Sequence, residues 1–303
     1  MCGIVGLFLK DPALQPELGA MLTDMLITMS DRGPDSAGIA IYGAAEPGRA
    51  KLTVQSDARA FDGLAGQLGV ELDLRIKDTH AVLSVNADKV EAVSAALAQN
   101  RPDLRIMSRG ETVEIYKEVG LPKDVADRFD LRGMTGTHGI GHTRMATESE
   151  VTTMGAHPFS TGMDQCLVHN GSLSNHNSLR RKLAREGVQV ATENDTEVAA
   201  AYLTWKMQNG ASLGEALEAG IDDLDGFYTF VVGTRDGFGV LRDPIACKPA
   251  VMAETEAYVA FGSEYRTLVN LPGIETAKVW EPEPATVYFW THDVAPAPTR
   301  KAA

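Results

Sequence analysis

The sequence has few cysteines and no long apolar run. Its three cysteines, Cys2, Cys166 and Cys247, are odd in number and widely spaced, with no CxxC pair, which excludes a disulfide framework and a compact zinc motif. No stretch approaches the roughly 18 apolar residues of a membrane-spanning helix, and the N-terminus lacks the basic segment and cleavage site of a signal peptide. We therefore expect a cytoplasmic protein without a membrane partner.

The sequence is also poor in basic residues. It has 28 Lys and Arg against 41 Asp and Glu, a formal net charge of −13, so a phosphate-binding surface and a nucleic-acid partner are not expected. Hydrophobic residues make up 44% and charged residues 23% of the 303 residues, proportions typical of a globular chain with a sizeable core. The length suits two domains, or one large domain with an insertion.

The hydrophobic pattern predicts strands and helices in mixed order. An apolar run at 4–9 predicts a buried strand, apolar residues at three- and four-residue steps predict a helix over 16–29, and 37–42 predicts another strand. After residue 133, strands are expected at 139–146, 165–169, 227–233, 238–242, 258–262 and 285–290, and helices at 175–185, 196–209 and 213–222. This order indicates an α+β fold of mainly antiparallel sheets.

Two segments differ from the rest. Residues from about 46 to 132 are more polar and predict an inserted small α+β unit with strands at 79–85, 104–108 and 112–116 and a helix at 88–99. Residues 291–303, with two prolines near the end, predict a loose C-terminal tail.

Cys2 is the first candidate for chemistry. The initiator methionine is commonly removed before a small residue, and its removal would leave a cysteine with a free α-amine. A model α-amine has a pKa of about 7.7–8.0, close enough to neutral to act as the general base for the thiol of the same residue. The alternative is a buried structural cysteine at the start of a strand.

Four further clusters have both a structural and a chemical interpretation. Asn170-Gly171 suits a hairpin turn or an oxyanion hole, Asp195 suits a helix N-cap or an ammonium-binding group, and Arg144 suits a structural ion pair or a carboxylate-binding group. The clusters are Asp31-Arg32-Gly33-Pro34-Asp35-Ser36, Gly141-His142-Thr143-Arg144-Met145-Ala146-Thr147, His169-Asn170-Gly171-Ser172 and Asn194-Asp195-Thr196-Glu197.

In this order, and after the N-terminal Cys-Gly-Ile-Val-Gly, the clusters resemble those of the class II glutamine amidotransferases. The resemblance continues through Asp225-Gly226-Phe227-Tyr228, Arg242-Asp243-Pro244 and Gly262-Ser263-Glu264, and covers roughly residues 2–50 and 133–270. It implies a four-layer αββα sandwich of the N-terminal-nucleophile hydrolases, here over residues 1–290 and interrupted by the insertion at about 46–132.

The resemblance implies a role for each site residue. Cys2 would supply nucleophile and base, while the Asn170 side-chain amide and the Gly171 N–H would stabilise the oxyanion, with glycine leaving room for substrate. For the free amino acid, Arg144 would bind the α-carboxylate and Asp195 the α-ammonium. By the same resemblance Arg32 and Thr147 complete the substrate-binding set, Arg32 by holding the nucleophile loop and Thr147 by lining the pocket.

Some residues depart from the family pattern or stand outside it. The family often has an aromatic residue where this sequence has Met145 and a histidine where it has Glu148, so amide hydrolysis is better supported than glutamine specificity. Cys166 and Cys247 have no surrounding motif and are interpreted as structural. The histidines 138, 142 and 157 have no metal-binding spacing, so no metal is expected.

The chain resembles most the stand-alone amidotransferase subunits of split glutamate-synthase-like complexes, such as that of N-methylglutamate synthase. This implies a hetero-oligomer in which glutamine or γ-glutamylmethylamide is hydrolysed and ammonia or methylamine passes to a glutamate-synthase-like FMN subunit, beside a β-helical subunit. No cofactor is expected in this chain; FMN and any iron–sulfur cluster would belong to the partner.

Two alternatives stay open. One is a non-catalytic scaffold subunit of the same complex, which a retained Met1 would favour because it blocks the amine. The other is hydrolysis of a different amide, which the pair of Arg144 and Asp195 disfavours.

Overall fold

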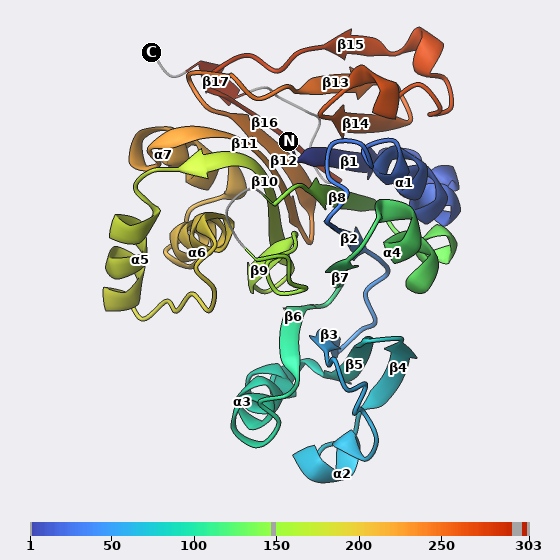
Figure 1. The fold of residues 1–303 in the computed structure, drawn as a ribbon, viewed down its shortest axis with the longest axis vertical. Helices are drawn as coiled ribbons and strands as arrows, with labels where there is room; N and C mark the ends of the chain where they lie inside the picture. Colours follow the sequence, from blue (N-terminus) through green and yellow to red (C-terminus); the bar gives the residue numbers. More distant parts are fainter. Residues whose placement is uncertain (1, 147–149, 293–298, 302–303) are drawn as a thin grey trace.

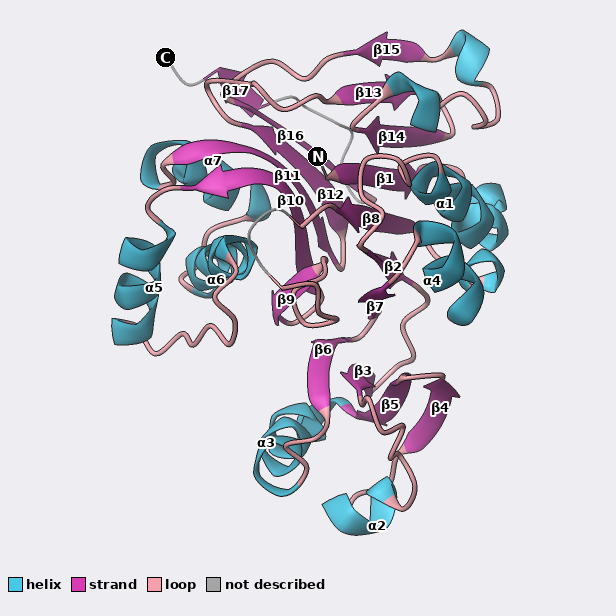
Figure 2. Cartoon of the chain, viewed as in Figure 1, coloured by secondary structure: helices cyan, strands magenta, loops and turns pink. Residues whose placement is uncertain are grey.

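The computed structural model describes residues 2–146, 150–292 and 299–301, and two large sheets form its centre (Figures 1 and 2). The first sheet has seven strands in the order β15 (Lys278–Trp280), β13 (Val251–Glu254), β14 (Tyr258–Gly262), β1 (Gly3–Leu9), β8 (His138–Arg144), β2 (Ser36–Tyr42) and β7 (Val113–Val119). The second has six strands in the order β17 (Thr299–Lys301), β16 (Thr286–Thr291), β12 (Gly237–Arg242), β11 (Gly226–Thr234), β10 (Gln165–Leu173) and β9 (Phe159–Gly162). All neighbouring strands in both sheets are antiparallel.

Helices cover the outer face of each sheet. The first sheet carries α1 (Leu18–Ile27) and α4 (Pro122–Arg128), and the second carries α5 (His176–Arg185), α6 (Asp195–Gln208) and α7 (Leu213–Asp223) (Figure 1). Short 3-10 helices lie at Pro12–Glu17, Ala87–Lys89, Leu131–Gly133, Tyr265–Thr267 and Ile274–Thr276. The predicted four-layer αββα sandwich is therefore confirmed.

Strand β1 shows why the layers form. Alternate side chains of a strand point to opposite faces of its sheet. Val5, Leu7 and Leu9 pack with α1, whereas Ile4 and Phe8 pack against the second sheet, and all five are buried. Because both faces are covered, the strand is an unbroken apolar run rather than an alternating one, as the sequence predicts for 4–9.

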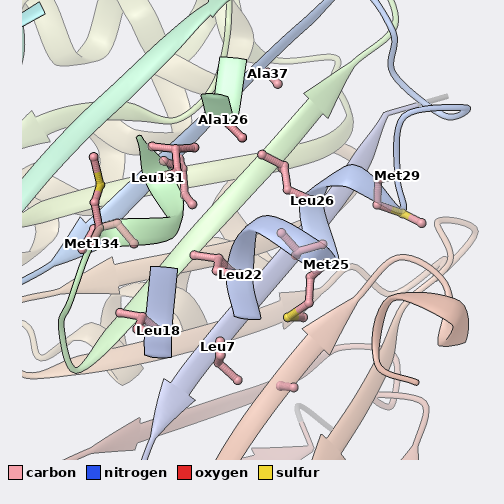
Figure 3. Close-up of a cluster of buried hydrophobic side chains, with 14 of the residues drawn as sticks. Leu7, Leu18, Leu22, Met25, Leu26, Met29, Ala37, Ala126, Leu131 and Met134 are labelled. Carbon is pink, nitrogen blue, oxygen red and sulfur yellow. The ribbon is translucent and has the colours of Figure 1, made fainter. Parts of the chain in front are cut away.

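Helix α1 packs closely on β8 because β8 has glycine where the helix passes. A Cβ at Gly139 would lie 2.7 Å from Leu22, and one at Gly141 would lie 3.0 Å from Leu26. Figure 3 shows Leu18, Leu22 and Leu26 on the face of α1 that points into this core. The helix begins at Leu18 rather than 16, because Pro16 lies inside the preceding 3-10 turn.

The insertion forms a third sheet with its own core. Strands β4 (Asp73–Lys77), β5 (His80–Asn86), β3 (Arg49–Gln55) and β6 (Arg105–Gly110) pair in this order. Helices α2 (Leu64–Leu68) and α3 (Val90–Asn100) cover one face, and in Figure 1 this unit lies below the sandwich. The hydrophobic pattern did not predict strands β3 and β4 or helix α2.

The chain returns to the sandwich earlier than the expected end of the insertion at 132. Strand β7 pairs with β2 over Val113–Val119, and α4 packs in the same core as α1. The separate sheet therefore ends at Gly110. Most of the predicted tail lies outside the described residues; within it, the backbone of residues 299–301 pairs with β16. In the part of the chain that the structure describes, no helix is long and apolar enough to cross a membrane.

We predict that Leu22→Ala lowers the free energy of unfolding by about 2–5 kcal/mol, because it removes most of a fully buried side chain and leaves a cavity between α1 and β8. Urea unfolding followed by circular dichroism measures the loss. Leu121→Ala is the control: Leu121 is 47% exposed, and its truncation should cost less than about 1 kcal/mol. Equal losses in both variants would contradict the close packing of α1 on β8.

Candidate active site

A cavity of about 260 Å³ opens at one end of the sandwich, where β1, β8, β10 and the N-terminus of α6 meet. Five predicted site residues line it together: Cys2, Arg144, Asn170, Gly171 and Asp195. Arg32 is outside the lining, and Thr147 and Glu148 lie outside the described residues. The remaining lining residues are Met145, Ala146, His157, His169, Asn194, Thr196 and Lys248.

Two hydrogen bonds to the carbonyl oxygen of Cys2 hold this residue in place. Arg32 Nε donates to it over 3.0 Å and Asn170 Nδ2 over 3.2 Å. The thiol lies 4.0 Å from the carbonyl oxygen of Met145. Cys2 precedes β1, in which Gly3 pairs with Thr143 of β8. The nucleophile candidate therefore lies beside the end of β8 that carries Arg144.

Arg32 connects the N-terminus to the other edge of β1. Its Nη1 donates to Glu264 Oε1 over 2.7 Å, and this contact lowers the pKa of the Glu264 carboxyl. Ser263, beside Glu264, exchanges hydrogen bonds with the backbone of Ile4, at 2.9 Å in each direction. Arg32 thus contacts the Cys2 residue rather than the cavity, the position implied for a residue that holds the nucleophile loop. Substrate binding by Arg32 stays a prediction.

Asn170 and Gly171 are consecutive residues of β10, so they face opposite sides of the sheet. The even-numbered Cys166 and Val168 pack between the sheets, so Asn170 points the same way, toward Cys2. Gly171 has φ +147°, and a Cβ there would lie 1.9 Å from the carbonyl oxygen of Phe227 on β11. The glycine is thus required by the neighbouring strand, and not only by the approach of substrate that the sequence analysis invoked.

Asp195 is the first residue of α6, not its N-cap. The N-cap is Asn194, whose side chain accepts from Thr196 N over 2.9 Å. Asp195 Oδ2 accepts from Leu173 N of β10 over 2.9 Å, and its Oδ1 lies 3.7 Å from His169 Nδ1. A carboxylate at a helix N-terminus interacts favourably with the helix dipole, and this one lines the cavity.

Arg144 ends β8 at the opposite wall of the cavity. Its side chain is buried, 7% exposed, and Nη1 donates to the carbonyl oxygen of Glu150 over 3.2 Å. Asp35 fixes the backbone around it, donating its N–H to Arg144 O over 3.1 Å and accepting from Ala146 N over 2.8 Å. The cavity therefore has a cation at one wall and a carboxylate at another.

Three buried histidines lie beneath the charged groups. His142 Nε2 donates to the carbonyl oxygen of His169 over 3.0 Å, and the hydroxyl of Thr196 bonds His157 Nε2 at 2.7 Å and His169 Nδ1 at 2.9 Å. Burial lowers the pKa of His142 to about 3 and lowers the pKa of His157 and His169 as well. All three are therefore neutral at pH 7.

The three histidines whose spacing matched no metal motif do not form one group in the structure. The His142 and His157 rings have centroids 4.0 Å apart and planes tilted by 40°, whereas His138 stacks on Tyr42 at 4.1 Å at the other end of β8. Within residues 2–146, 150–292 and 299–301, no three or more His, Cys, Asp or Glu side chains are grouped to hold a metal ion.

The other two cysteines lie away from the cavity lining. Cys166 is buried, its Sγ is 3.1 Å from the Tyr42 hydroxyl, and burial raises its pKa to about 12. Cys247 is exposed. The charge of Asp164 also raises the pKa of Cys166, which opposes activation of that thiol.

The sequence analysis assigned no role to several residues that line the cavity. His169 and Thr196 lie within the quoted motifs, and Lys248 follows the motif Arg242-Asp243-Pro244. Their nearness to these motifs was the sequence feature that could have pointed to them. His157 was considered only as a metal ligand. Its contact with Thr196 joins residues 39 positions apart.

Comparison with known proteins finds similarity to glutamine amidotransferases. Residues 127–301 match the model of the glutamine amidotransferase domain family. The chain is 67% identical over 300 residues to the glutamine amidotransferase-like protein GlxB of Rhizobium meliloti, covering 97% of this chain and all of that protein. It is 38% identical over 120 residues to a glutamine–fructose-6-phosphate aminotransferase of Vibrio vulnificus, covering 40% of this chain and 20% of that one.

Among solved structures, the glutamine phosphoribosylpyrophosphate amidotransferase of B. subtilis, complexed with ADP and GMP, aligns with a TM-score of 0.63 at 18% sequence identity. The alignment covers 96% of this chain and 48% of that structure, so the chain spans about half its length. At this identity the likeness concerns the fold.

We predict that acid destabilises the protein through its neutral buried histidines. The folded pKa of His142, about 3, is below the ordinary value of 6.5, so its stabilising contribution is complete above about pH 6.5 and is lost as the pH falls. As the pH falls below about 6.5 toward the folded pKa, each such histidine lowers the free energy of unfolding by up to about 1.4 kcal/mol for each pH unit. Urea unfolding of the wild type and of His142→Gln at pH 7, 6 and 5 should show the slope flattened by about that amount. Equal slopes would contradict burial of a neutral His142.

Proposed function

Because the chain belongs to the class II glutamine amidotransferase family, we propose that it hydrolyses the γ-amide of glutamine, or of γ-glutamylmethylamide, through Cys2. One observation carries the proposal: Cys2, Asn170, Arg144 and Asp195 line one cavity of about 260 Å³. A free amino acid has a carboxylate and an ammonium, and the cavity offers an arginine and a carboxylate on different elements beside the thiol.

The first half of the proposed reaction breaks the amide bond. After removal of Met1, the Cys2 α-amine takes the thiol proton and Sγ bonds to the γ-carbonyl carbon. The Asn170 amide and the Gly171 N–H donate to the oxyanion. When the tetrahedral intermediate collapses, the C–N bond breaks and the amine leaves with the proton held by the Cys2 amine. The product is a γ-glutamyl thioester.

The second half releases glutamate. The Cys2 amine accepts a proton from water as the water oxygen bonds to the thioester carbonyl carbon, and the C–S bond breaks to return the thiol. Arg144 and Asp195 bind groups that do not react, so they contribute equally to binding substrate and transition state. Their loss should therefore affect KM more than kcat.

We propose that the released ammonia or methylamine passes to a separate glutamate-synthase-like FMN subunit, in a hetero-oligomer of the N-methylglutamate synthase type with a β-helical third subunit. GlxB supports a separate amidotransferase chain, because this chain aligns with that protein over its whole length. The FMN, and any iron–sulfur cluster, would belong to the partner. Met145 at the cavity, in place of the aromatic residue common in the family, supports an N-methylated amide.

We predict that 6-diazo-5-oxo-L-norleucine, a thiol-reactive glutamine analogue, adds once to the purified chain and that the adduct requires Cys2. Intact mass spectrometry should show loss of the Met1 mass together with one adduct. The adduct should be absent in Cys2→Ala and retained in Cys247→Ala, which removes the exposed thiol outside the cavity. A retained Met1 and no adduct, with the partner subunits present, would instead favour the non-catalytic scaffold.

We predict opposite kinetic signatures for the two parts of the site. Asn170→Ala should lower kcat about 10²–10³-fold, because an oxyanion donor acts in the transition state. Asp195→Asn should raise KM with a smaller change in kcat. Amine release from glutamine and from γ-glutamylmethylamide, measured in the assembled complex, tests both variants and shows which amide is preferred. Unchanged kcat in Asn170→Ala would remove Asn170 from the oxyanion site.

A further inference from the structure

A buried lysine lies next to the candidate site and has no role in the proposed chemistry. Lys117 of β7 is 3% exposed, and its ammonium donates to the carbonyl oxygens of Ala156 at 2.7 Å, Pro158 at 3.2 Å and Met154 at 3.4 Å. It also lies over the Phe159 ring, 4.4 Å from the centroid. An ammonium has three N–H donors, so three carbonyls of one segment use all of them.

Burying a lysine ammonium costs free energy unless it is hydrogen-bonded, and a purely structural contact could be made by an uncharged side chain. Desolvation lowers the Lys117 pKa to about 7 against the attraction of Glu197. The segment that receives this ammonium, residues 150–158, forms the wall of the cavity at His157. Three of its backbone carbonyls, those of Met154, Ala156 and Pro158, accept hydrogen bonds from Lys117.

The same segment contacts Arg144 directly and reaches Asp195 only through the neighbouring Thr196. At one end, the Glu150 carbonyl accepts from Arg144 Nη1 over 3.2 Å. At the other, His157 Nε2 bonds the Thr196 hydroxyl at 2.7 Å, and Thr196 adjoins Asp195 in the first turn of α6. The shape of the segment therefore sets the positions of the arginine and of the helix terminus that carries the carboxylate.

A second residue of β7 holds the middle of the segment. Glu118 accepts a short hydrogen bond from the Thr153 hydroxyl, and its other oxygen accepts from Thr79 of the inserted unit over 3.2 Å. Gly38 of β2 allows the segment to lie close, because a Cβ there would be 2.2 Å from the His157 carbonyl oxygen. Two consecutive β7 residues thus contact the segment, Lys117 at three backbone carbonyls and Glu118 at the Thr153 hydroxyl.

We propose that Lys117 is a positioning residue for substrate binding: its ammonium holds residues 150–158 in the conformation that directs Arg144 and Asp195 at the two charged ends of the amino acid. The inference rests on the proposed function, because it concerns the orientation of the same substrate. It assigns Lys117 no contact with the reacting atoms, so its removal should weaken binding and leave the chemical step nearly unchanged.

The test measures glutamine binding to the full chain by calorimetry in a Cys2→Ala background, where the nucleophile is absent and turnover is prevented. Lys117→Met keeps the side-chain length and removes the ammonium, and it should weaken binding at least tenfold. Lys206→Met is the matched control: Lys206 also lies over an aromatic ring, Trp205 at 5.4 Å, and pairs with Asp223, but on α6 away from the cavity lining. Its Kd should stay within twofold.

Thr153→Val is a second variant in case Lys117→Met does not fold. It deletes only the hydroxyl that Glu118 holds, and it should weaken glutamine binding about threefold. In the assembled complex, otherwise wild type at Cys2, either variant should raise KM by these factors with kcat within twofold. A Kd equal to the reference in the folded variant, or a loss confined to kcat, would overturn the inference.

Hydrogen exchange separates failure of this inference from failure of the proposed function. Without any ligand, amides of 150–158 should exchange faster in Lys117→Met, or in Thr153→Val, than in Lys206→Met. If the Cys2→Ala reference binds no glutamine, the proposed function fails, and the exchange alone then decides whether Lys117 holds the segment. Unchanged exchange in the segment would overturn the inference whatever the ligand.

Discussion

The two hydrogen bonds accepted by the Cys2 carbonyl oxygen are the contacts on which the site depends. A chain terminus normally frays, and a nucleophile there needs anchors on more than one side. Arg32 comes from the turn after α1 and is itself held by Glu264 after β14, while Asn170 comes from the second sheet. Cys2, the proposed nucleophile, is thus held by contacts from the turn after α1 and from the second sheet.

The charges of the cavity follow from what surrounds it. The buried histidines 142, 157 and 169 are neutral because burial lowers each pKa. Arg144, Asp195 and Lys248 therefore determine the electrostatic potential that a substrate meets. In a partly enclosed site such charges act more strongly than they would in water, which suits a small zwitterion and fits the neutral polar network beneath them.

The elements that could be predicted are those with a strong pattern. The buried run of β1, the periodic leucines of α1 and the Gly210 that follows α6 were enough to place those elements within one or two residues. Strand β4 has little apolar burial to signal it, because four of its five residues are exposed. Strand β3, Arg49–Gln55, does alternate polar and apolar residues as a strand should, so it could have been predicted. Strand β7 was assigned to the insertion because pairing with β2 is a long-range contact that no local pattern contains.

By itself, the sequence predicted Cys2 as the candidate nucleophile and the motif residues around it, and the order of its apolar runs predicted an α+β fold of mainly antiparallel sheets. The four-layer αββα class followed from the family resemblance that those motifs carry. Only the tertiary structure decided that Arg32 holds Cys2, that Gly171 is required by the backbone of Phe227, and that Lys117 holds the wall of the cavity. These three facts are contacts between residues 30 or more positions apart. Strand register and burial create such contacts, and neither can be read from local composition.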